Sequence, residues 1–98
     1  MKLKTGLVCF GEVNTPYEKL VSLYGEAKKS LLSLDYELGD AGIVIDDSEY
    51  KTAGEAVDKL KGFDMCCLIV CVAGWVPTHT VIRVVDEYRH VPIVLWGL

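Results

Sequence analysis

The sequence predicts an α/β domain with three layers, in which a parallel β-sheet lies between two layers of helices. Short apolar runs bounded by turn residues, above all Met65–Gly74, indicate strands that are buried on both faces, as in parallel sheets covered by helices. These runs alternate with segments of helical periodicity, which implies parallel pairing and right-handed crossovers. With 98 residues, 51% of them hydrophobic, residues 1–98 should form a single domain with a substantial core.

The first predicted strand, Leu3–Phe10, is followed by a helix that begins near Pro16 and runs to about Leu34. Thr15 fits an N-cap, proline suits the first helical position, and Glu18 completes a capping box. One apolar stripe at helical spacing should face the sheet: Tyr17, Leu20, Tyr24, Ala27, Leu31 and Leu34.

The second strand is expected at Ala41–Ile45, perhaps after a short extended piece, because Gly39 and Gly42 interrupt the residues around it. Thr52 and Glu55 form a second capping box, and the helix that they open should end at the glycine at position 62. Its inward side chains are Ala53, Ala56, Val57 and Leu60.

The last elements are a strand at Met65–Ala73, a helix from near Pro77 to about Arg89, and a strand at Pro92–Trp96. Val81, Val84, Val85 and Tyr88 give this helix its apolar spacing. The order βαβαβαβ favours a flavodoxin-like sheet with strand order 2-1-3-4. That fold normally continues with another helix and strand, so we expect the chain to be the truncated N-terminal domain of a longer protein.

Charge and hydropathy exclude several classes of partner. A net charge of −4, a pI near 5.0 and scattered basic residues argue against nucleic acid and against an anionic membrane. The longest apolar run is too short to span a bilayer, and the N-terminus lacks the long apolar stretch and cleavage site of a signal peptide. We therefore expect a cytoplasmic protein.

All four cysteines lie inside apolar, strand-like runs, and their spacing matches no common zinc pattern. The sequence therefore predicts reduced, buried cysteines that act as small hydrophobic residues: Cys9, Cys66, Cys67 and Cys71.

The candidate ligand site is the carboxyl edge of the sheet, where the predicted order places a switch point between the first and third strands. Glu12 and Asn14 follow the first strand, and Trp75 and His79 follow the third. The indole could stack on a sugar ring, and the imidazole could hydrogen-bond hydroxyl groups. The alternative is that the two loop residues are merely solvated and that the indole caps the end of the sheet.

Two other sites are weaker. Asp46 and Asp47 could bind a metal or act in acid–base chemistry, although a solvated turn before a helix explains them as well. Cys9 stands where some phosphotransfer domains keep a nucleophile, but the following loop has no arginine and contains Glu12, which would repel phosphate. No glycine-rich dinucleotide motif or P-loop occurs.

Two motifs, AGWVPTH at Ala73–His79 and VPIVLWG at Val91–Gly97, resemble the first domain of the L-fucose/L-arabinose isomerase family, as do the aspartate pair and the helix Thr52–Leu60. The resemblance covers most of this chain but only the first domain of the much longer family members. It implies reversible aldose–ketose isomerisation through an enediol, with a divalent metal, typically Mn²⁺, in the full-length parent.

The family's metal ligands and catalytic carboxylates lie in later domains, so the resemblance implies no catalytic residue, metal ligand or cofactor in this segment. It implies a homo-oligomer in which this domain contacts the other domains and helps to form the sugar pocket of a neighbouring subunit. That role falls on Trp75, with His79 as a weaker neighbour. The loop Gly11–Thr15 matches neither subgroup, which leaves the sugar open.

Overall fold

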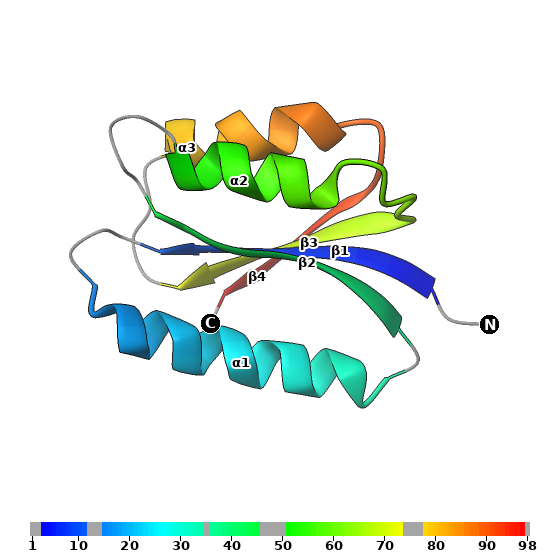
Figure 1. The fold of residues 1–98 in the computed structure, drawn as a ribbon. Helices are drawn as coiled ribbons and strands as arrows, with labels where there is room; N and C mark the ends of the chain where they lie inside the picture. Colours follow the sequence, from blue (N-terminus) through cyan, green and yellow to red (C-terminus); the bar gives the residue numbers. More distant parts are fainter. Residues whose placement is uncertain (1–2, 12–14, 35, 46–50, 74–77, 98) are drawn as a thin grey trace.

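A computed structural model describes residues 3–11, 15–34, 36–45, 51–73 and 78–97 and has the predicted α/β architecture. Strands and helices alternate along the chain, with one short 3₁₀ helix, η1, before the last strand (Figure 1). Their bounds are β1 Leu3–Gly11, α1 Tyr17–Leu32, β2 Tyr36–Ile45, α2 Lys51–Leu60, β3 Cys67–Ala73, α3 Thr78–Val85, η1 Asp86–Tyr88 and β4 Ile93–Gly97.

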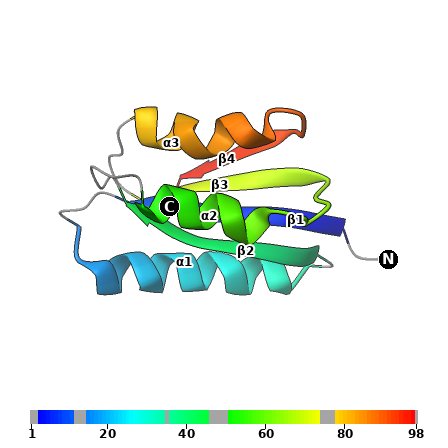
Figure 2. The ribbon, with the colours of Figure 1, turned by 45° about the horizontal axis from the view of Figure 1, so that its top comes forward.

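All neighbouring strands are parallel, and the sheet order is β2-β1-β3-β4. This confirms the predicted flavodoxin-like order. Helix α1 covers one face of the sheet, while α2 and α3 cover the other, so the fold has three layers (Figures 1 and 2). The central strands β1 and β3 are therefore covered on both sides, as the continuous apolar runs predict.

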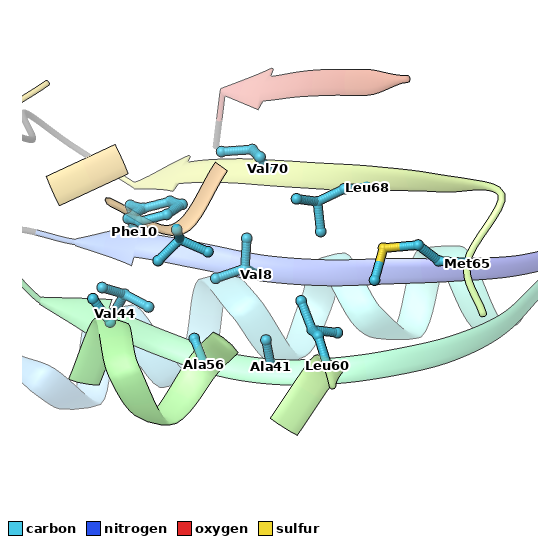
Figure 3. Packing of buried hydrophobic residues seen from close by; sticks show 11 residues of the cluster. Val8, Phe10, Ala41, Val44, Ala56, Leu60, Met65, Leu68 and Val70 are labelled. Atoms are coloured by element: carbon cyan, nitrogen blue, oxygen red, sulfur yellow. The ribbon is translucent and has the colours of Figure 1, made fainter. Parts of the chain in front are cut away.

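Two core clusters lie on opposite faces of the sheet, and β1 contributes to both because its side chains alternate. Val8 and Phe10 pack on the α2/α3 face, where Figure 3 shows them together with Val44, Val70 and other apolar side chains. Leu7 and Cys9 pack on the α1 face against a stripe of α1. The buried members of that stripe are Leu20, Tyr24, Ala27 and Leu31.

The ends of the predicted first helix differ from the structure. Pro16 takes the N-cap position and no side chain caps the helix, so the prediction of Thr15 as a hydrogen-bonding N-cap is wrong. The backbone oxygen of the proline instead accepts from the N–H groups of Lys19 and Leu20. The predicted inward residues Tyr17 and Leu34 are exposed, because only the middle of the stripe packs against the sheet.

Strand β2 is twice as long as predicted, since it includes both glycines that were expected to interrupt it. A Cβ atom added at Gly39 would lie 2.6 Å from Cδ2 of Phe63. The glycine therefore lets the aromatic ring pack directly against the backbone of β2. Gly42, with a φ of 84°, lies where the β1–β2 register shifts between Leu7 and Cys9. A glycine is the favoured residue for such a bulge.

A polar network holds this bulge. The Tyr24 hydroxyl donates to Asp40 and lies 3.3 Å from the carbonyl oxygen of Leu7. The same carboxylate accepts the Gly42 N–H at 2.9 Å and pairs with Nζ of Lys28 at 3.0 Å. Burial disfavours the charged carboxylate, but these hydrogen bonds outweigh that cost and lower the pKa of Asp40. Burial, followed by the bond to the carboxylate, raises the pKa of Tyr24.

The second predicted capping box is also wrong. Helix α2 begins at Lys51, one residue before Thr52, whose hydroxyl exchanges hydrogen bonds of 3.1 Å with the backbone N–H and C=O of Ile45. This pair ties the start of α2 to the carboxyl end of β2. The strand β3 begins at Cys67, two residues later than predicted, and the α-helical part of the last helix ends at Val85.

Candidate functional site

The ends of β1 and β3 are neighbours at the carboxyl edge of the sheet, where Gly11 pairs in register with Ala73. This is the switch point of the strand order, with β2 on one side and β4 on the other. In open parallel sheets, ligands bind in the crevice outside such strand ends. The strand order therefore identifies this edge as the candidate site.

The residues expected to form the site divide into two groups. Glu12, Asn14 and Trp75 lie outside the described residues, as do the alternative pair Asp46 and Asp47. Their predicted roles therefore stay predictions. Of the four predicted site residues, the structure describes His79 alone.

Gly11 allows a close approach between β1 and α1. A Cβ atom added at this position would lie 2.5 Å from Cδ2 of Leu20, a side chain that is fully buried. The first turn of α1 therefore packs on the backbone at the end of β1. Together with the bonds between Thr52 and Ile45, this contact anchors the ends of two adjacent strands to the helices beside them.

His79, the second residue of α3, is exposed and lines a groove of about 660 Å³ between α2 and α3. Across the groove lie Gly54 and Val57 of α2. A Cβ atom added at Gly54 would meet nothing within 4 Å, so the groove is open above this glycine. The wider lining is polar and of mixed charge and includes Asp58, Arg83, Asp86 and Glu87. The sequence analysis did not predict this groove, although a glycine inside a helix was a signal for it.

Thr80 is a second residue that the sequence analysis missed. It lies in the first turn of α3, is only 1% exposed, and its Oγ1 has no hydrogen-bond partner among the residues that the structure describes. It precedes the buried Val84 by four residues, and this spacing could have identified it as an inward residue.

The four cysteines do not share one environment. Cys9 and Cys71 are buried register partners on β1 and β3. Burial, followed by the neighbouring Cys71 thiol, raises the pKa of Cys9 to about 12, and burial raises the pKa of Cys71 to about 11. Cys66 is exposed and Cys67 half-buried, so the prediction that all four are buried is wrong for these two. Both lie at the entry to β3, before the strand reaches the core.

Thiol labelling should separate these environments. In the folded protein we expect Cys66 to react quickly with a thiol reagent, while Cys9 and Cys71 react only after denaturation, because the thiolate is the reactive form. Mass spectrometry of quenched time points would give the rate at each site, and Cys66→Ser should remove the fast phase. Labelling of Cys9 as fast as Cys66 in the native state would restore it as a candidate nucleophile.

The described part of the chain holds no cluster of three or more His, Cys, Asp or Glu side chains that could bind a metal ion. In the same part, no helix combines the length and the apolar character that crossing a membrane requires.

Comparison with known proteins adds no relative. No family model matches the chain, and neither a curated protein nor a solved structure matches it.

Proposed function

We propose that this chain is the flavodoxin-like N-terminal domain of an aldose–ketose isomerase that resembles the L-fucose/L-arabinose isomerases. In that cytoplasmic parent it contributes to subunit assembly and to the rim of the sugar pocket, and it is not catalytic alone. The catalytic carboxylates and the ligands for Mn²⁺ would come from domains outside this chain.

The observation that carries this proposal is the pairing of Gly11 with Ala73 at the switch point. The segment that follows the first of these residues contains Glu12, and the segment that follows the second contains Trp75. The residues proposed for the rim thus leave the sheet from adjacent strand ends, on the side where parallel sheets bind ligands.

A rim role fits the chemistry at this edge better than a complete active site does. Isomerisation between an aldose and a ketose requires a base that moves a proton between neighbouring carbons and a group that polarises the carbonyl. The residues that end the four strands, Gly11, Ile45, Ala73 and Gly97, offer neither. An indole and an imidazole can instead hold a sugar by stacking and by hydrogen bonds to its hydroxyl groups.

The competing hypothesis is a small binding or phosphotransfer domain that uses Cys9 or the Asp46–Asp47 pair. A thiol nucleophile must be accessible and must ionise near neutral pH. Cys9 is fully buried with a pKa raised to about 12, first by burial and then by Cys71, which argues against that version.

A nuclear magnetic resonance titration would test the proposal. We expect L-fucose or L-arabinose to shift backbone amide signals at Gly11, Ala73 and His79 with weak, saturable affinity, and the chain with added Mn²⁺ to produce no ketose. His79→Ala and Trp75→Ala should weaken the response. The matched control is His90→Ala, since this histidine is exposed and lies before β4, at the opposite end of the sheet.

Two results would contradict the proposal. Unchanged signals with both sugars at high concentration would remove the rim role. Metal-dependent turnover by the chain alone would show that the site is complete, and the division of labour with other domains would then be wrong.

A further inference from the structure

The strand β4 forms an unprotected edge of the sheet. Among the described strands it pairs with β3 alone, and Leu95 and Val94 are 72% and 48% exposed. The strand Ile93–Gly97 contains no charged residue and no proline. An exposed apolar edge of this kind can form hydrogen bonds with a further strand.

The opposite edge is protected in ways that β4 is not. The strand β2 carries the exposed acidic side chains Glu37 and Asp40. It also has a bulge, where Gly42 takes a positive φ. Charges and bulges are the features by which native proteins prevent edge strands from pairing. The contrast points to β4 as the edge that is open to a partner.

The hydrogen bonds of β4 show which residues face outward. The N–H of Leu68 donates to the carbonyl oxygen of Pro92 at 2.9 Å. Along a strand, the backbone groups of successive residues point to opposite sides, so Val94 and Trp96 also face β3. Ile93, Leu95 and Gly97 therefore direct their N–H and C=O groups to the free edge.

We propose that two copies of the chain pair antiparallel through β4, about a two-fold axis at Leu95, to form one continuous sheet. In this register the two Leu95 residues face each other, and Ile93 faces Gly97 of the partner subunit. Every outward backbone group of the strand then finds a partner. On the α1 face, Val94 lies opposite Trp96 of the partner subunit, a β-branched and aromatic pair of the kind that stabilises sheets.

Charge and size agree with a second copy as the occupant. Each molecule carries a net charge of −4, so two copies approach most easily through an uncharged edge, whereas the acidic β2 edge would repel its own kind. Five residues extend over roughly 17 Å, and pairing over that length buries less than the roughly 800 Å² per partner of a stable complex. The dimer should therefore depend on concentration.

This inference rests on the assembly role proposed above and adds to it the surface and the symmetry. Sedimentation over roughly a hundredfold range of concentration should show monomers that convert to dimers. Leu95→Pro removes one outward N–H but leaves the ladder to β3 intact, because the lost donor faces the free edge. We expect it to weaken the dimer by roughly a hundredfold.

Two controls separate backbone pairing from general stickiness. Leu95→Ala keeps the N–H and should weaken the dimer by roughly tenfold at most. Leu32→Ala removes an apolar side chain that is 62% exposed on α1 and should have no effect. An equal loss in both Leu95 variants would mean that side-chain contact drives association, and a dimer that survives Leu95→Pro would overturn the proposal.

Hydrogen exchange of the unmodified chain gives an independent test. The amides of Ile93, Leu95 and Gly97 should exchange quickly in dilute protein and slowly in concentrated protein, while Val94 and Trp96 stay protected in both. A monomer at every concentration, with no change in exchange, would overturn the inference. The sugar titration is a separate readout, so a monomer that binds sugar would leave the proposed function standing.

Discussion

Raising the pH from about 9 to about 11 should lower the free energy of unfolding by roughly 5 kcal/mol. The reason lies in two buried thiols on adjacent strands. The pKa of Cys9 is raised to about 12, by burial and then by Cys71, and burial raises the pKa of Cys71 to about 11. The same thiols in the unfolded chain ionise near pH 9.

The sign follows from where the protons are bound. Above pH 9 the unfolded chain loses the two thiol protons, whereas the folded protein keeps them until the pH reaches the raised pKa values. The stabilisation is thus complete below about pH 8.5 and is lost as the pH rises through 11 and 12. Each thiol contributes roughly 1.4 kcal/mol per pH unit in this window. The raised pKa of Tyr24 acts in the same direction at higher pH.

Urea unfolding at several pH values, with a reductant present, would measure the slope. The double variant Cys9→Ala/Cys71→Ala should be less stable at pH 7 but should lose much less stability between pH 9 and 11. Cys66→Ala is the matched control, because its thiol is exposed, and it should keep the steep slope. Equal slopes in all three proteins would contradict the assignment.

The alternation of apolar runs with helical periodicity was enough to predict the layers and the strand order. Local detail was less predictable, because it depends on contacts between distant residues. The glycines of β2 read as breaks until the structure shows Phe63 against Gly39 and the carboxylate of Asp40 on the Gly42 amide. Likewise, Thr52 matches a cap in sequence but bonds to the end of β2.

The location of the candidate site was predictable, but its composition was not. A strand order of 2-1-3-4 identifies the ends of β1 and β3 as the switch point, and the pairing of Gly11 with Ala73 confirms that they are adjacent. The groove beside His79 and the buried hydroxyl of Thr80 depend on how α2 and α3 pack together. Nothing in the local sequence determines that packing.

Truncating Phe10 should have an effect of similar size on stability. Phe10 is fully buried on β1, directly before Gly11, and it packs on the α2/α3 face beside its register partner Val44 (Figure 3). Phe10→Ala should cost roughly 3–5 kcal/mol, because it removes the transfer energy of the ring and leaves a cavity among close-packed side chains. That is a large share of the roughly 5–15 kcal/mol that keeps a small domain folded.

A graded series makes this prediction specific to packing. Phe10→Leu retains most of the apolar volume and should cost less than half as much as Phe10→Ala. Tyr17→Ala removes an aromatic ring that is exposed on α1, so its cost should stay within about 0.5 kcal/mol. Denaturant unfolding of the three variants at pH 7 would rank them. An alanine variant no less stable than the leucine variant would mean that the α2/α3 face collapses around the loss, and that the end of β1 is not held by this ring.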